Sequence, residues 1–161
     1  MMVFRKLLVL FFLMPCLASC LASREDADFV RRSIEAHRLA DAAIEKGDVA
    51  EARARLEAIW QEQAAGSLAE ADRRVILQDV AYRLADLESA AGEHEQALVR
   101  CDAGLALGQH DDLFTANLLV ERGRALDDLG RDGEAVKSYA QAMRINEQLL
   151  DGALAARRGA L

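Results

Sequence analysis

Small and hydrophobic residues recur at fixed distances from three glycines along the chain. When Gly47, Gly92 and Gly130 are aligned, a small residue lies seven positions before each glycine and an alanine lies five positions after it. A larger residue follows one helical turn beyond each alanine. These three sets are Ala40, Ala85 and Gly123, then Ala52, Ala97 and Ala135, then Leu56, Cys101 and Tyr139. The recurrence predicts three similar structural units.

Each unit is predicted to be a pair of antiparallel helices. The chain is rich in Ala, Leu, Arg and Glu, which are strong helix formers, and no proline follows Pro15. No run of alternating β-branched residues suggests a strand, so the fold class is all-α. Two helices approach closely where the side chains between them are small, and glycine supplies the positive φ that ends the first helix. Carboxylates favoured by the helix dipole stand near the starts of the second helices: Asp48, Glu93 and Glu134.

This pattern resembles the tetratricopeptide repeat, a helix-turn-helix unit of 34 residues. The resemblance implies a solenoid of about three repeats, at residues 33–66, 78–111 and 116–149. Ser67 and Asp111 or Asp112 are expected to cap the first helices of the second and third repeats. The chain departs from the family pattern where an aromatic or apolar residue is common, at Val49, Glu88, His94 and Asp132.

The N-terminal segment has the features of an export signal. Arg5 and Lys6 precede an apolar stretch that is shorter than the ~20 residues of a membrane-spanning helix. The sequence "LASC" at its end resembles the lipobox of bacterial lipoproteins, which implies a signal peptide of residues 1–19 and a lipidated Cys20. An ordinary secretory signal cleaved near Ala22 and an uncleaved anchor helix are the alternatives. A metal or redox pair with Cys16 would need further ligands, and no Cys or His follows closely.

The same resemblance predicts where the protein resides. Ser23 to Asp26 reads as a capping box, so residues 20–23 would form a short lipidated tether and residues 24–161 the repeat domain. Leu21 follows the lipidated cysteine, and a residue other than Asp there implies the periplasmic face of the outer membrane. In a Gram-positive cell the same signal implies the outer face of the cytoplasmic membrane.

Charge narrows the choice of partner. The chain carries a net charge of −7, and loss of Arg5 and Lys6 would make it more acidic. An acidic chain is a poor nucleic-acid ligand and is repelled by anionic headgroups, so membrane attachment would depend on acyl chains. Cys101 would be the remaining thiol after processing, which leaves no disulfide framework and favours a buried structural role.

The family resemblance also predicts a binding groove, because first helices line the concave face of such solenoids. The positions carried over are Ile34, His37, Asp41, Glu45, Asp79, Tyr82, Asp86, Ser89, Asn117, Val120, Arg124, Asp127 and Asp128. The groove is acidic and lacks the Lys and Asn with which some family members clamp a terminal carboxylate. A basic or neutral extended segment is therefore the expected ligand. A solvated face without a ligand is the alternative.

The sequence offers little for catalysis. His37, His94 and His110 fall in different repeats without metal-ligand spacing, and no phosphate-binding loop or catalytic triad is visible. We therefore expect neither metal, cofactor nor enzymatic activity.

The C-terminal end is expected to break at Gly152. The last repeat helix would then expose an apolar face around Tyr139, Ala142, Met143 and Leu149, unless residues 153–158 fold back over it.

Anchor and repeats together resemble tetratricopeptide lipoproteins that help to assemble outer-membrane machines, including pilotin-like ones. The expected function is a protein-interaction adaptor, or scaffold, in a cell-envelope complex. The alternatives are a self-assembling structural protein that uses the C-terminal end, and an accessory subunit of a cell-wall enzyme.

Overall fold

The part of the chain that the structure describes consists of helices joined by turns and loops. The computed structural model describes residues 3–62 and 68–159, with side chains from residue 24 onward. No strand occurs in these ranges, so the predicted all-α class is confirmed. The helices are α1 (Val3–Glu45), α2 (Val49–Gln61), α3 (Glu70–Ala90), α4 (His94–Ala106), α5 (Leu113–Asp128) and α6 (Asp132–Gly159).

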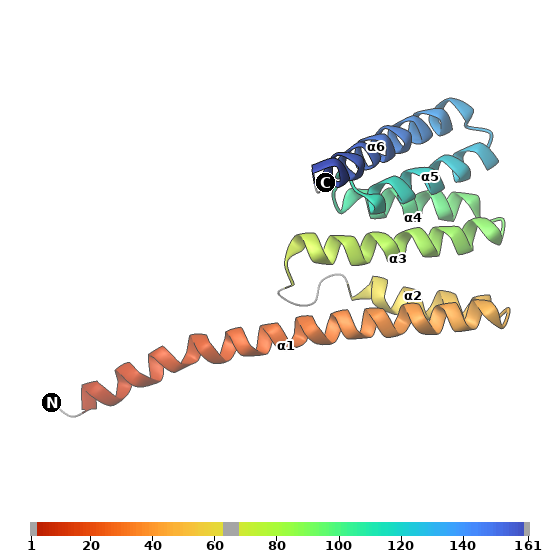
Figure 1. Ribbon diagram of the computed structural model, residues 1–161. Helices are drawn as coiled ribbons and strands as arrows, with labels where there is room; N and C mark the ends of the chain where they lie inside the picture. The colour runs from red at the N-terminus through yellow and green to blue at the C-terminus, as the bar shows by residue number, and fades with distance from the viewer. Residues whose placement is uncertain (1–2, 63–67, 160–161) are drawn as a thin grey trace.

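Consecutive helices pair into three hairpins that stack into a solenoid (Figure 1). The hairpin turns contain Gly47, Gly92 and Gly130, with φ angles of 76°, 80° and 70°. Only glycine adopts this left-handed conformation without strain, so each glycine ends the first helix of its hairpin. The predicted helix-turn-helix solenoid is confirmed.

The structure confirms some of the residues that were expected near the helix starts. Asp48 caps α2 by accepting a hydrogen bond from the Glu51 amide at 3.1 Å. Asp112, one of the two candidates, caps α5 by accepting from the Thr115 amide at 2.9 Å. Ala69 occupies the N-cap of α3 and offers no side-chain hydrogen bond. The expected cap Ser67 lies outside the described residues.

The core consists of two hydrophobic clusters. One joins α1, α2 and α3 and includes Phe29, Leu56 and Leu84. The other joins α3 to α6 and includes Cys101 and Leu126. Trp60 packs against both clusters and so links the first hairpin to the rest of the solenoid.

Small residues allow the paired helices to come close. The aligned alanines Ala40, Ala52, Ala85 and Ala97 are fully buried. At Gly123 a side chain would not fit, because an added Cβ would lie 2.5 Å from Cε1 of Tyr139. The recurring small positions of the sequence are therefore helix-contact positions.

The C-terminal end differs from the expectation. α6 continues through Gly152 to Gly159, so the predicted break is wrong and residues 153–158 do not fold back over the last hairpin. A single glycine costs a helix only about 1 kcal/mol relative to alanine, and the residues around Gly152 are mostly Leu and Ala, which favour helix.

The N-terminal predictions remain predictions. The backbone of α1 is helical across residues 20–23. The signal peptide of residues 1–19, the lipidated Cys20 and the tether lie outside the residues with described side chains. Among the helical residues that are described, none belongs to a helix long and apolar enough to cross a membrane.

Candidate functional site: the face of the first helices

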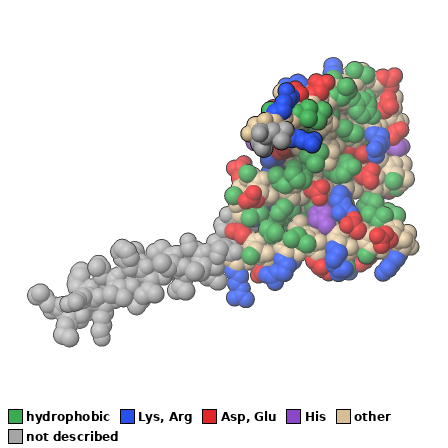
Figure 2. All heavy atoms as spheres, in the orientation of Figure 1, with side chains coloured by type: hydrophobic (Ala, Val, Ile, Leu, Met, Phe, Trp, Pro, Cys, Tyr) green, Lys and Arg blue, Asp and Glu red, His purple; other side chains and the backbone are tan. Residues whose placement is uncertain are grey.

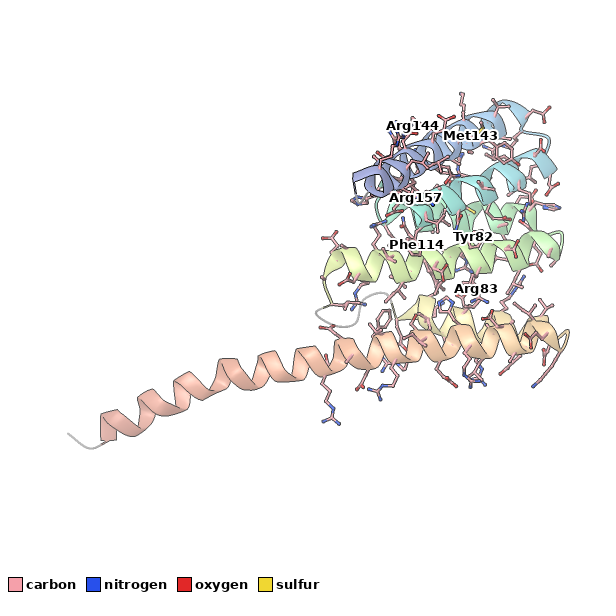
Figure 3. The ribbon with its side chains drawn as sticks, in the orientation of Figure 1. Tyr82, Arg83, Phe114, Met143, Arg144 and Arg157 are labelled. Atoms are coloured by element: carbon pink, nitrogen blue, oxygen red, sulfur yellow. The ribbon has the colours of Figure 1, made fainter. Side chains whose placement is uncertain are left out.

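The first helices of the three hairpins, α1, α3 and α5, carry all of the predicted groove residues. We call the surface made by His37, Asp41, Asp79, Tyr82, Arg83, Asp86, Glu121 and Arg124 the A-helix face. Figure 2 shows the molecule with hydrophobic side chains gathered between acidic and basic ones. On α3, Tyr82 and Arg83 are adjacent and point toward different neighbouring helices (Figure 3).

Arg83 connects α3 to α1. Its Nη1 lies 2.9 Å from Nδ1 of His37, and its Nη2 pairs with the carboxylate of Asp41. The same His37 nitrogen lies 3.5 Å from Oδ2 of Asp79. Burial lowers the pKa of His37, and the Arg83 charge acts in the same direction, while Asp79 and Asp41 oppose it. The imidazole is therefore held toward its neutral form.

Arg124 connects α5 to α3 in the same way. Its Nη1 lies 3.0 Å from Oδ1 of Asp86 and 2.8 Å from Oε2 of Glu121. Glu121 is fully buried, and its Oε1 accepts a hydrogen bond from the Ser89 hydroxyl at 2.6 Å. Burial raises the pKa of Glu121, although Ser89 and Arg124 both favour the carboxylate. These partners offset part of the cost of burying a charge.

A pocket of about 250 Å³ opens between the first and second hairpins. Ile44, Leu56 and Leu87 provide its apolar walls. Asp79, Tyr82, Arg83 and Asp86 complete the lining. Tyr82 is half-buried against the second core cluster, so its ring is held in place by packing. The pocket is therefore apolar inside and carries carboxylates in its lining.

The structure brings together only some of the predicted residues. His37, Asp41, Asp79, Tyr82, Asp86 and Arg124 form the A-helix face. Glu45 and Asp127 are exposed, Asn117 is half-buried, and Val120 is 37% exposed. In the described part of the chain, no side-chain hydrogen bond or ion pair joins these four residues to the face.

Sequence reasoning missed two residues of this face, Arg83 and Glu121. Each is the next residue in the sequence after a predicted site residue: Arg83 follows Tyr82, and Glu121 follows Val120. Arg83 stands four positions after Asp79, a spacing that places both on one side of the helix. A search for complementary charges at such spacings would have indicated it. With Arg83 and Arg124 in place, the face is less acidic than its carboxylates alone suggested.

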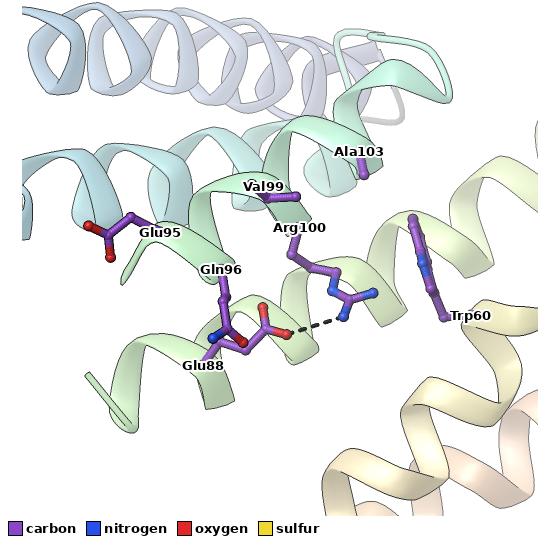
Figure 4. A pocket seen from close by; sticks show the side chains of 7 residues that line it. All are labelled: Trp60, Glu88, Glu95, Gln96, Val99, Arg100 and Ala103. Atoms are coloured by element: carbon purple, nitrogen blue, oxygen red, sulfur yellow. Dashed lines mark hydrogen bonds and ion pairs between the residues drawn. The ribbon is translucent and has the colours of Figure 1, made fainter. Parts of the chain in front are cut away.

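A second pocket, of about 420 Å³, lies among α2, α3 and α4 (Figure 4). Arg100 lies in its wall. The Nη2 atom of Arg100 is 3.2 Å from Oε1 of Glu88 and 3.1 Å from Oε2 of Glu57. The guanidinium carbon of Arg100 also lies 5.4 Å from the centre of the Trp60 ring. The buried Glu88, a departure from the family pattern, is thus compensated by Arg100. This arrangement holds helices together and need not involve a ligand.

The described residues provide no metal-binding cluster of His, Cys, Asp or Glu. Cys101 is fully buried, and burial raises the pKa of its thiol well above the ordinary value. A thiol in this setting stays protonated and is a poor nucleophile.

One comparison with known proteins agrees with this geometry. Residues 116–149, which span nearly all of α5 and the first part of α6, match the tetratricopeptide repeat family. These are the residues predicted for the third repeat. No curated protein matches the chain. The protein is an all-α helical-repeat solenoid that contains a tetratricopeptide repeat, a unit that generally acts as a non-catalytic scaffold for protein–protein interaction.

Proposed function

We propose that this protein is a lipid-anchored adaptor that binds an extended segment of a partner protein on its A-helix face, in assembly of a cell-envelope complex. The observation that carries the proposal is the pocket between the first two hairpins. It combines apolar walls at Ile44 and Leu87 with the carboxylates of Asp79 and Asp86. A surface of this kind suits peptide recognition better than catalysis.

The pocket favours a basic side chain in the bound segment. Lysine and arginine have an apolar stem that can lie against Ile44 and Leu87 and a charged end that carboxylates attract. Asp86 is already paired with the guanidinium of Arg124, whereas the charged partner of Asp79 among the described residues is the imidazole of His37, at 3.5 Å. Asp79 is therefore the preferred partner of the incoming charge. Pairing within the pocket would fix the register of the segment.

The envelope location rests on the N-terminal sequence. The basic start, the short apolar stretch and Cys20 support export and lipidation, and Leu21 favours the periplasmic face of the outer membrane. A Cys20→Ala variant should be released from the membrane or accumulate unprocessed. Membrane-bound Cys20→Ala protein of mature size would overturn the anchor.

In-cell photo-crosslinking tests the adaptor role. A crosslinking residue at position 44, which is 42% exposed and lines the pocket, should capture one dominant envelope protein. The control position is Val99 on α4, which is 69% exposed and lies outside the A-helix face. Asp79→Lys should abolish capture from position 44 while far-ultraviolet circular dichroism stays unchanged. Equal capture from both positions, or none from position 44, would contradict the proposal.

A further inference from the structure

The last helix, α6, packs on the solenoid through one side only. Its buried residues are Ala135, Ser138, Ala142 and Ile145. Away from this side lie large hydrophobic residues that remain exposed: Val136 (65%), Met143 (62%), Leu150 (59%) and Leu154 (42%). Met143 lies on α6, at the opposite end of the solenoid from α1 (Figure 3). The sequence prediction of an exposed apolar face at this end is therefore right for Met143 and for Leu149, which is 38% exposed, whereas Tyr139 is half-buried and Ala142 is buried.

The exposed residues form one continuous stripe. Val136, Met143 and Leu150 are spaced by seven residues, and Ala140 and Leu154 stand four positions after Val136 and Leu150. Spacing that alternates between four and three residues keeps side chains on one side of a helix and is the pattern of helices that pair lengthwise. Only Glu147 interrupts the stripe. We call the six residues along this line the α6 stripe: Val136, Ala140, Met143, Glu147, Leu150 and Leu154.

The second half of α6 is not packed against the other residues that the structure describes. Every residue from Asn146 to Gly159 is exposed. A helical segment this short is marginal in water without packing, and Gly152 weakens it by about 1 kcal/mol. A helix that covered the stripe would supply the missing packing.

The charges of α6 indicate which helix fits. Asp132 and Glu134 lie in its first turn, and Arg157 and Arg158 lie in its last turn. Two α6 helices side by side in the same direction would bring like charges together. In opposite directions, the acidic start of each helix meets the basic end of the other.

The stripe also matches itself in this antiparallel arrangement. If Val136 of one copy lies opposite Leu154 of the second, the same alignment places Ala140 opposite Leu150 and Met143 opposite Glu147. Arg144 of each copy then lies beside Glu147 of the other. The one charge in the stripe would thus receive an opposite charge from the second copy.

We propose that the α6 stripe is the interface of a homodimer, in which the α6 helices of two copies pair in opposite directions about a two-fold axis. Such an interface is self-complementary, as closed two-fold symmetry requires. The proposed dimer goes beyond the adaptor function, and its interface is a different surface from the A-helix face. The dimer joins two solenoids end to end and presents two A-helix faces.

Light scattering after size-exclusion chromatography of the full chain in mild detergent tests the dimer. The wild-type protein should have the mass of two chains, and Met143→Asp with Leu150→Asp should give one chain with unchanged helicity. Ile34→Asp, at a residue 65% exposed on α1, is the matched control and should remain dimeric. A wild-type monomer, or a double variant that stays dimeric, would overturn the proposal.

A charge exchange tests the alignment of the two helices. Arg144→Glu should weaken dimerisation about tenfold, because it places two acidic side chains together. Adding Glu147→Arg in the same chain should restore the wild-type dissociation constant. Failure to restore it would overturn the antiparallel pairing. A photo-crosslinker at position 143 in cells should yield the mass of two chains, and capture of a different protein there would overturn the second copy as the occupant.

Discussion

The contact between Gly123 and Tyr139 shows how one residue sets the distance between α5 and α6. An added Cβ at Gly123 would lie 2.5 to 2.8 Å from three atoms of the Tyr139 ring. The glycine is therefore a packing requirement, and its conformation is ordinary helix.

We predict that Gly123→Ala destabilises the fold by about 1–3 kcal/mol, the usual cost of overpacking, despite the better helix propensity of alanine. Gly133→Ala is the matched control in α6, because nothing lies within 4 Å of a Cβ added there. It should leave stability unchanged or raise it slightly. Urea denaturation measures both, and equal stability of the two variants would contradict the role of Gly123.

His37 makes stability depend on pH. Burial lowers its pKa, so between the folded-state pKa and the ordinary value of about 6.5 the unfolded chain binds more protons than the folded one. Stability should therefore fall as the pH drops through this window. The surrounding charges are Asp41, Asp79 and Arg83.

The comparison is with His37→Gln, which keeps a polar side chain but does not titrate. When the pH is lowered from about 7.5 to about 5.5, the urea midpoint of unfolding should fall further for the wild-type protein than for His37→Gln. Glu121, whose pKa is raised, is present in both proteins, so its contribution cancels. The same pH dependence in both would show that His37 is not the titrating group.

At the scale of single residues, the sequence predicted what depends on local spacing. The turn glycines and the burial of Cys101 follow from the repeat pattern. The pairs Arg83–Asp41 and Arg124–Asp86 join residues about 40 positions apart, 42 and 38 respectively. Such pairs depend on how hairpins stack, which the spacing within one repeat does not specify.

At the scale of elements, the start of α5 is tied to α3. Asp112 caps α5, and its Oδ2 also accepts a hydrogen bond from Nη2 of Arg74 at 2.7 Å. Arg74 in turn donates to the side chain of Gln78, which bonds the carbonyl of Gly108 at 2.7 Å. One carboxylate thus ends a chain of contacts that positions the third hairpin on the second.

Asp112→Ala should lower stability by about 1–2 kcal/mol, because the helix loses its cap and Arg74 loses its ion pair. Its neighbour Asp111 is the control, since in the described part of the chain it makes neither contact. Asp111→Ala should change stability by less than about 0.5 kcal/mol. Thermal unfolding followed by circular dichroism gives both values. If both variants melted alike, the cap would not be the cause.

The elements themselves were largely predictable, and Gly152 shows the limit. Helix type and turn positions follow from composition and glycine spacing. The position where α6 ends depended on whether the low helix propensity of Gly152 outweighs the high helix propensity of Leu150, Ala153 and Leu154. A cost of about 1 kcal/mol does not end a helix by itself. Breaker residues indicate a boundary only where other signals agree.

At the scale of the whole molecule, Arg100 joins the first hairpin to the second. It pairs with Glu57 of α2 and with Glu88 of α3, while its own helix is α4. Removing it would leave the buried Glu88 carboxylate without its charge partner. Arg100→Ala should therefore cost about 2–4 kcal/mol, somewhat reduced because Arg100 is 19% exposed.

The double variant Glu88→Leu with Arg100→Met separates charge from packing. It removes both charges and places an apolar residue where tetratricopeptide repeats commonly have one. It should be clearly more stable than Arg100→Ala alone, as judged by urea denaturation. A double variant as unstable as the single one would mean that Arg100 acts through packing and not by neutralising Glu88.

The order of the repeats was predictable from three aligned glycines, as were the face of the first helices and the exposed position of Met143, but the details of both surfaces were not. The A-helix face depends on ion pairs between helices, and the α6 stripe depends on which side of α6 packs inward. Both follow from the direction in which hairpins stack. That direction depends on contacts between hairpins, such as the pair of Arg83 with Asp41, which the spacing within one repeat does not specify.

Trp60, which lies where the two core clusters meet, also makes the molecule its own optical probe. It is the only tryptophan in the chain, so selective excitation near 295 nm reports on this junction alone. Separation of the first hairpin from the other two would expose the indole to water and shift its emission to longer wavelength. Partial opening of the solenoid could thus be followed in real time without attaching a dye.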